Sequence, residues 1–427
     1  MAGPETWLLR TNGNYEVRRT SKVHLLRYTS ELEAYMARLA QQLYRVDTYI
    51  SLVRGSARIM STDELIFSAP ISFTSWNTTG LYDWEKQFRD LSLHRSKQPM
   101  MQIVKDLGVA NKCPDAEVLV EDVQISLCYT HRQVITLQTR VQSGSYHIDS
   151  SAFPDIMAIR SQLECLKERL DEITFGSVCA EGLRLHYRGF EEDSPGWQSV
   201  VEARVQTLWF DTTMLYHTLS LHLYVNIPRV SQVVNDFALD MENLAPDQQQ
   251  IVGTRRCNTS TWVLTSLGRG ALCCAADTLS SLQGLVVRPL IDKSRLDPIS
   301  YIAAATAALI VWTHIHMGLY ACINCAPEMS FEVDLGHEVD LSPSPCPRAC
   351  LNTSIPKEDW IGKMILTRVF LDNVELCHCN IAKLLDKFRV FIPKNWDLAD
   401  AIAPGVFSAD LLAIAAVKMK DRDSYVH

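Results

Sequence analysis

Leu43-Tyr-Arg-Val-Asp-Thr-Tyr-Ile-Ser-Leu-Val-Arg-Gly55, continuing through Ile59-Met-Ser-Thr-Asp-Glu64 to Ala69-Pro-Ile71, is the most informative stretch of this chain. Apolar residues recur in it at helical spacing, at Tyr44, Val46, Tyr49, Ile50 and Val53. Gly55 stands where a left-handed residue ends a helix, and Asp47 interrupts an otherwise apolar face. The stretch predicts a helix closed by glycine, then a capped turn and an apolar strip that ends at proline.

Helical patterns extend outward from this stretch in both directions. Ser30-Glu-Leu-Glu33 has the spacing of a capping box, and an apolar stripe continues from Leu32 to about Val53. Ser61 and Glu64 have the same spacing. Further helical patterns cover residues 99–110, 121–142, 153–175, 198–225, 260–283, 298–320, 358–388 and 408–419, while alternating strand patterns are scarce. We therefore predict an all-α fold, a large multi-helix bundle with irregular loops.

Composition bounds the class of protein. The 427 residues are 47% hydrophobic and 21% charged, as expected of a globular chain that buries a large core. The net charge of -8 argues against DNA binding by this chain alone, because lysine and arginine dominate affinity for phosphates. The N-terminus has no secretory signal pattern, and thirteen cysteines, mostly in apolar runs, suit reduced thiols in the cytosol or nucleus.

One segment raises the possibility of a membrane span. No Asp, Glu, Lys or Arg lies between Asp297 and Glu328, and an Ala-rich apolar run begins at Tyr301. Thr313, His314 and His316 interrupt that run before it reaches the roughly 18 to 20 residues that a bilayer requires. We expect a helix buried at the centre of a helical bundle, with a membrane-associated helical protein as the alternative.

The cysteines near the C-terminal end are the candidates for a metal site. Cys322, Cys325, Cys346 and Cys350 form two short pairs across a loop, which is compatible with one tetrahedral zinc ion. Their spacing is unlike a fungal zinc cluster, which packs six thiols among basic residues, and the second histidine of a C2H2 finger is missing. We favour buried thiols, since Cys322 ends an apolar helix, and expect no cofactor.

Enzyme motifs give little support for catalysis. A class I terpene cyclase is the natural alternative for a large helical chain, and Asn235-Asp-Phe-Ala-Leu-Asp-Met-Glu242 begins like its magnesium-binding triad. Leu239 replaces the hydroxyl ligand, so a solvated acidic face is the favoured interpretation. Nucleophile-elbow, P-loop, dinucleotide and zinc-protease motifs are absent, and we predict no enzyme.

Asp47 lies on an apolar helix face. We interpret it as a buried acceptor paired through Arg45 or Arg54, not as a catalytic carboxylate.

The opening stretch resembles the middle homology region of the fungal-specific transcription factor regulatory domain. Comparable positions are held by Tyr44, Asp47, Ser51, Gly55, Ile59, Asp63, Glu64 and Pro70, and Trp76 and Trp84 follow as aromatic anchors. The family's Arg-Pro after the glycine is replaced by Ser56-Ala57. Leu215 to Asn226 is similar in style to a later family helix with aromatic and histidine residues facing a groove.

The resemblance implies a nuclear regulator of transcription. The family's zinc-cluster or C2H2 DNA-binding module normally precedes this region, and we expect it to be absent here. The chain is then a truncated regulator, a regulator that works by binding a partner, or a remnant whose DNA-binding part is encoded elsewhere. The implied partners are proteins of the transcription machinery or a DNA-binding subunit, with a small-molecule effector as a further option, and no membrane. We expect an extension at residues 1–26, the helical regulatory domain at 27–325, a Pro-rich loop at 326–357 and C-terminal helices on the same domain at 358–427.

Overall fold

The computed structural model describes residues 36–61, 63, 65, 67, 99–109, 118–143, 153–175, 187, 196–237, 239, 241–287, 296–318, 320, 331–335, 353–354, 357–362, 368–394 and 396–406. Among these residues, the first helical stretch covers 36–54. The elements that follow are α4 (Met100–Leu107), α5 (Val120–Ser143), α6 (Phe153–Phe175), α8 (Trp197–Tyr224), α9 (Ile227–Phe237), η5 (Met241–Asn243), α10 (Pro246–Val263), α11 (Ser266–Val287), α12 (Pro298–Met317), β1 (Phe331–Asp334), β2 (Thr353–Ser354), α13 (Lys357–Gly362), β3 (Arg368–Leu371), β4 (Val374–Glu375), η7 (His378–Asn380), α14 (Ile381–Arg389) and α15 (Leu398–Ile402). The predicted all-α fold is confirmed, with one small sheet added.

The chain forms two compact units, each built from separate stretches. Unit 1 comprises Met1–Asp47, Ile59–Tyr129 and Glu168–Trp209, and unit 2 comprises Thr48–Arg58, Thr130–Lys167 and Phe210–His427. The helix at 36–54 and α5, α6 and α8 each run from one unit into the other. The boundaries predicted at residues 26, 325 and 357 stay predictions.

Unit 1 has a small core around Tyr187. This side chain is buried with Leu119, Val201 and Val205. Its hydroxyl donates to Glu121 Oε2 at 2.5 Å and accepts from the backbone N–H of Val120 at 3.1 Å. Burial, together with the Glu121 carboxylate, holds the pKa of Tyr187 well above its usual value. The phenol therefore stays neutral and ties this core to the start of α5.

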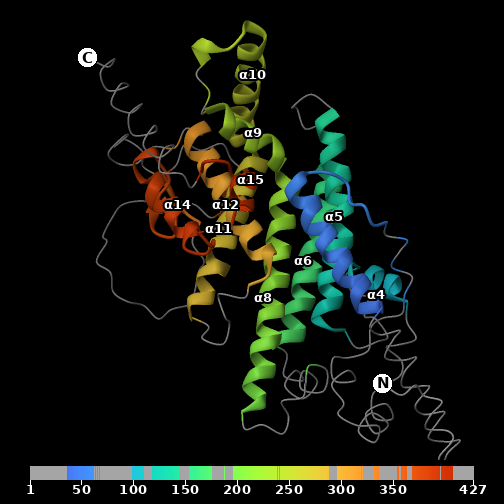
Figure 1. The fold of residues 1–427 in the computed structure, drawn as a ribbon. Helices are drawn as coiled ribbons and strands as arrows, with labels where there is room; N and C mark the ends of the chain where they lie inside the picture. Colours follow the sequence, from blue (N-terminus) through green and yellow to red (C-terminus); the bar gives the residue numbers. More distant parts are fainter. Residues whose placement is uncertain are drawn as a thin grey trace, which may run out of the picture. The chain divides into compact units, whose positions relative to one another are not determined.

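α12 is the central helix of unit 2 (Figure 1). It packs against α9, α10, α11, α14 and α15, and nearly every one of its side chains is buried, including the small ones from Ala303 to Ala308. Asp297 begins the helix by accepting from the N–H of Ile299 at 3.1 Å, and Pro298 follows at its first position. Small residues on all sides let the neighbouring helices approach closely, as predicted.

The same helix is the only one in the described part of the chain that is long and apolar enough to cross a membrane. An 18-residue window of this helix has a mean hydropathy of 1.4, yet 89% of that window is buried inside the protein. Burial of this extent is typical of a core helix and favours that interpretation of the Asp297–Glu328 segment.

The single helix predicted at 260–283 is wrong, because α10 ends at Val263 and α11 begins at Ser266. Thr265 causes the break: its hydroxyl accepts from the N–H of Gly268 at 3.1 Å, which is the geometry of an N-cap. Gly268 itself lies close to the backbone of Val263 and the carbonyl of Trp262. The helices α9 and α10 were not predicted as separate elements either.

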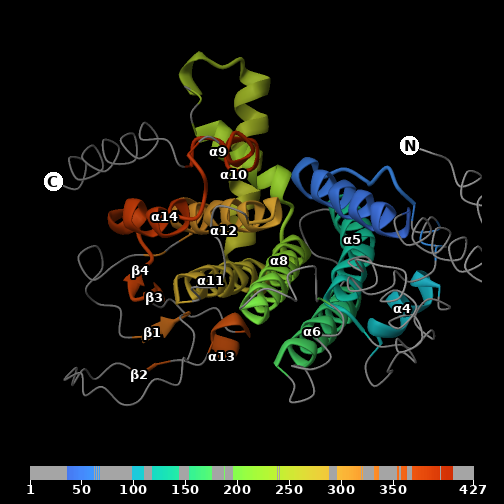
Figure 2. The ribbon, with the colours of Figure 1, turned by 60° about the horizontal axis from the view of Figure 1, so that its bottom comes forward.

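A small sheet replaces part of the predicted C-terminal helix and loop. Its strand order is β2-β1-β3-β4, with β1 parallel to both β2 and β3, and β3 antiparallel to β4 (Figure 2). The helix predicted at 358–388 is therefore wrong over residues 368–375, and the loop predicted at 326–357 contains β1 and β2. The predicted helix at 408–419 lies outside the described residues.

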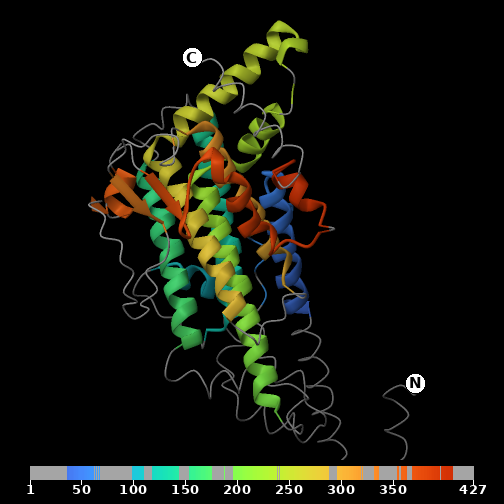
Figure 3. The ribbon, with the colours of Figure 1, turned by 90° about the vertical axis from the view of Figure 1, so that its left-hand side faces the viewer.

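The turn between β3 and β4 explains why a strand pair forms here. Asp372 and Asn373 both adopt positive φ angles, 48° and 59°, which is the conformation of a two-residue hairpin turn. The Asp372 carboxylate accepts from Gln283 Nε2 on α11 at 2.6 Å and pairs with Lys387 on α14. Figure 3 shows the orange and red strands beside the gold helix α11. Burial alone would raise the pKa of Asp372, but these two partners lower it.

Candidate functional site

The family-like stretch forms the end of the helix at 36–54 and the turn after it, and we take it as the candidate site. Tyr44 is fully buried and Ser51 nearly so, on the face that packs into the protein. The helix ends at Arg54, and Gly55 follows with a φ of 62°, as the sequence predicted. Glu64 and Pro70, with Trp76 and Trp84, lie outside the described residues.

Asp47 belongs to unit 1 and closes the turn after its own helix. Its carboxylate, which is buried, accepts from the backbone N–H of Ile59 at 3.2 Å and of Met60 at 2.8 Å. The expected pairing with Arg45 or Arg54 is wrong, since Arg45 donates to Gln124 Oε1 at 3.2 Å instead. Two main-chain donors satisfy a buried carboxylate without a cation. Asp47 therefore fixes the chain's path out of the helix.

The rest of the predicted turn is exposed. Asp63 accepts a long hydrogen bond from the hydroxyl of Ser61 at 3.4 Å, and its own N–H donates to the same hydroxyl at 3.3 Å. This is a local turn motif in which a serine side chain stands in for a backbone group. Both contacts stay on the surface, so Asp63 has a local structural role.

In unit 2, the end of the same helix meets two helices that are remote in sequence. Ser51 donates to the carbonyl of Ser56, and its oxygen lies 3.4 Å from Nε2 of His131 on α5. Gly55 packs against Pro228 at the start of α9, so closely that a methyl group on it would overlap the proline ring. The glycine is therefore needed for two reasons, its backbone angle and its lack of a side chain.

Two buried histidines complete this part of unit 2. Burial lowers the pKa of His131 well below its usual value, with Arg58 and His222 adding to the effect, and burial lowers the pKa of His222 to about 4. In the described part of the chain, Nδ1 of each ring has no hydrogen-bond partner. Gln138 donates to the backbone carbonyls of His222 and of Val225, the latter at 2.8 Å. Both imidazoles are thus neutral core groups.

The position of these histidines limits their chemistry. His131 and His222 are each about 1% exposed, so a substrate from solvent reaches neither ring. Within Leu215 to Asn226, His222 is buried in α8 while Tyr216 and Tyr224 are partly exposed, so the resemblance to a family helix that faces a groove stays a prediction. The sequence offered one signal for the pair, namely histidines within apolar helices, but nothing indicated that α5 and α8 would bring them together.

We expect acid to destabilise the protein through His222. Its folded pKa of about 4 lies below the usual 6.5, so the unfolded chain binds the proton first and stability falls as the pH drops from 6.5 towards 4. His222→Leu removes this group. Urea unfolding between pH 7 and pH 4 should show the variant losing about 3 kcal/mol less than the wild type. Equal losses in both proteins would contradict the assignment.

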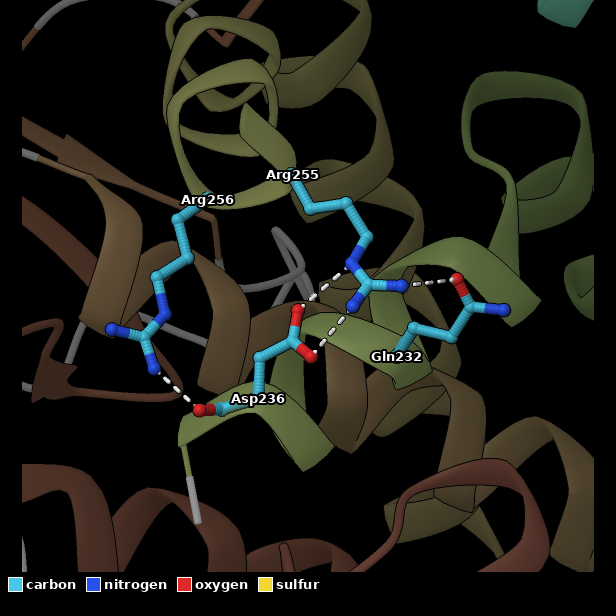
Figure 4. Close-up of polar contacts among 4 residues, drawn as sticks. All are labelled: Gln232, Asp236, Arg255 and Arg256. Atoms are coloured by element: carbon cyan, nitrogen blue, oxygen red, sulfur yellow. Dashed lines mark hydrogen bonds and ion pairs between the residues drawn. The ribbon is translucent and has the colours of Figure 1, made fainter. Parts of the chain in front are cut away.

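Asp236, the first acidic residue of the cyclase-like motif, is held by two arginines from α10 (Figure 4). Arg255 binds its carboxylate with two hydrogen bonds of 2.9 Å, and Arg256 donates to its backbone carbonyl at the end of α9. Arg256 also lies 4.6 Å from the centre of the Phe237 ring. The expected solvated acidic face is wrong for Asp236, which is 3% exposed.

This pairing decides what Asp236 can do. Both oxygens of this buried carboxylate accept from one guanidinium, so Asp236 would have to give up a charge-assisted pair before it could turn to a metal ion. Arg255 is further held by Gln232 at 3.4 Å. The geometry gives Asp236 the role of joining α9 to α10.

His314 and His316 face different neighbours, as their spacing predicted. His314 is fully buried beside Trp262, with Nδ1 at 3.2 Å from the hydroxyl of Tyr320, and burial lowers its pKa to about 3. His316 packs on the rings of Trp312 and His378. The two histidines therefore belong to aromatic packing on opposite flanks of α12.

Metal binding was expected only as a minor option. Cys322, Cys325, Cys346 and Cys350 all lie outside the described residues, so the zinc hypothesis stays a prediction. Among the residues that the structure does describe, there is no group of three or more His, Cys, Asp or Glu side chains that could hold a metal ion.

Comparisons of the chain with protein-family models, with curated proteins and with solved structures find no match. The candidate site therefore rests on the geometry of its own residues.

Proposed function

We propose that this chain is the helical regulatory domain of a fungal-type transcription regulator, which works in the nucleus through protein partners. The observation that carries the proposal is the arrangement of the family-like stretch. Tyr44 is buried, Asp47 closes the following turn and Gly55 ends the helix in the left-handed region. These local roles are compatible with the positions that the resemblance assigns to the three residues.

The fold and the charge support the same proposal. The chain is all-α with a large buried core, which is compatible with a helical regulatory domain. Its net charge is -8, which opposes attraction to a phosphate backbone. We therefore propose that contact with DNA is supplied by a partner, either a DNA-binding subunit or the transcription machinery.

The class I terpene cyclase alternative is not favoured by the geometry of its motif. Its first acidic residue would have to leave Arg255 before it could bind magnesium, and that rearrangement would leave a partly buried guanidinium without its carboxylate partner. Asp236 is better explained as a structural residue.

The proposal predicts that the purified chain does not bind DNA by itself. In fluorescence anisotropy with random-sequence duplex DNA at about 150 mM salt, we expect no saturable binding up to micromolar protein, because few phosphates would be neutralised. Lowering the salt to about 50 mM should produce weak binding at most. A nanomolar complex that weakens steeply with added salt would contradict the proposal, since it would show that the chain contacts DNA directly.

A further inference from the structure

Two histidine side chains from distant parts of unit 2 meet at the end of α12. His316 lies in the last turn of that helix, and His378 is the first residue of η7. Their imidazole rings contact each other, with the ring centres 4.9 Å apart and the ring planes at 74°. Both side chains are partly exposed, whereas those of His131, His222 and His314 are buried. An ion from solvent therefore has access to this pair and not to the buried histidines.

The separation of the two rings matches that of imidazoles bound to one metal ion. A ligating ring nitrogen lies about 2.0 to 2.1 Å from zinc, and the ring centre lies about 1.1 Å farther away. Two such rings, at an angle of roughly 90° to 109° around the ion, have centres about 4.5 to 5.2 Å apart. The observed 4.9 Å falls within that range. Because the torsion that turns a histidine ring is broad, each ring can direct a nitrogen to the shared position while its centre stays nearly in place.

The surroundings of the pair set its affinity. His316 lies at the C-terminal end of a 20-residue helix, where the partial negative charge of the helix dipole favours a cation. The guanidinium of Arg256 lies over Phe237, whose ring centre is 5.4 Å from that of His316, and this positive charge opposes a second cation. Among the described residues, no third His, Cys, Asp or Glu side chain completes the group. We therefore expect micromolar rather than nanomolar affinity, with water in the remaining positions around the ion.

We propose that His316 and His378 together bind one divalent transition-metal ion. Imidazole nitrogen suits zinc, copper and nickel, whereas magnesium and calcium prefer oxygen ligands. The ion joins the end of α12 to η7, and so to α14, which follows η7 and packs against α12. Binding requires neutral imidazoles, so it weakens as the pH falls and the rings take up protons. The inference depends neither on the proposed function nor on the cysteine site predicted from the sequence.

The first test counts the zinc bound to the full chain after equilibrium dialysis at about 50 µM free zinc and near-neutral pH. His316→Phe and His378→Phe each keep an aromatic ring but remove the ligating nitrogens. Each should bind about one equivalent less than the wild type, and the double variant should also bind about one less, because both histidines hold the same ion. The control is His217→Gln, since His217 is a buried histidine bonded to Ser281 at 2.9 Å. This variant should bind as much zinc as the wild type.

A second experiment separates this ion from zinc held by cysteines and from a loss of fold. Cys322→Ser and Cys325→Ser, introduced together into the wild type and into His378→Phe, should leave the difference of about one equivalent between them unchanged. Circular dichroism should be the same in all variants, and glutamine replaces phenylalanine at either position if a variant does not fold. Equal zinc in the wild type and His378→Phe, a loss in one single variant alone, a loss of two equivalents in the double variant, or a difference that disappears without the two cysteines would each overturn the proposal.

Discussion

Replacing Gly55 by alanine is expected to destabilise the protein by about 3 kcal/mol or more. The φ of 62° at this position costs an alanine roughly 1 to 2 kcal/mol. Its Cβ would also overlap Cγ of Pro228 and lie 3.3 Å from Cδ of the same ring, so the start of α9 would have to move. Urea unfolding followed by circular dichroism measures the loss.

Two further variants separate these causes. Gly253 lies inside α10 with no atom within 4 Å of a built Cβ, so Gly253→Ala should leave stability unchanged or raise it by up to about 1 kcal/mol. Pro228→Ala added to Gly55→Ala should recover the steric part of the loss and leave the backbone part. If Gly55→Ala proved as harmless as Gly253→Ala, the role assigned to Gly55 would be wrong.

Asp236→Ala is expected to cost about 2 to 4 kcal/mol. The Asp236 side chain is 4% exposed and that of Arg255 is 28% exposed. Water can therefore hydrate the unpaired guanidinium only in part. Removing the carboxylate also removes the ion pair that joins α9 to α10 beside α12. Thermal and urea unfolding should show the loss.

A double-mutant cycle isolates the ion pair from other effects of the substitution. Asp236→Ala and Arg255→Ala should each destabilise the protein, while the double variant should lose clearly less than the sum, with a coupling of more than about 1 kcal/mol. Additive losses would mean that the two side chains do not stabilise each other, contrary to the bidentate geometry.

Hydrophobic periodicity predicted most of the long helices. The helices α5, α6, α8 and α12 lie within a few residues of their predicted limits, because apolar residues recur along each of them at helical spacing. α10 could not be found in this way, since its side chains are polar all round and few of them are buried. The hairpin was missed for a different reason. Asp372 and Asn373 are a turn signal, but they lie within a stretch with helical spacing.

The sequence likewise predicted one part of the candidate site and missed another. Gly55 was predicted correctly because its role is local to the helix it ends. The partners of Asp47 were not, because main-chain donors leave no trace in the sequence and two nearby arginines offered a plausible alternative. The approach of His131 to Ser51 depends on how α5 packs against the earlier helix, which no local pattern specifies. Tertiary packing, rather than sequence spacing, decides these contacts.

The most direct test of the regulatory role fuses the chain to an unrelated DNA-binding domain and measures transcription of a reporter in a fungal cell. The account predicts a several-fold change in reporter output relative to the DNA-binding domain alone. Gly253→Ala should preserve this change, while Gly55→Ala should reduce it in proportion to the folded fraction. A wild-type fusion that is nuclear, folded and abundant but leaves the reporter unchanged would contradict the proposed function.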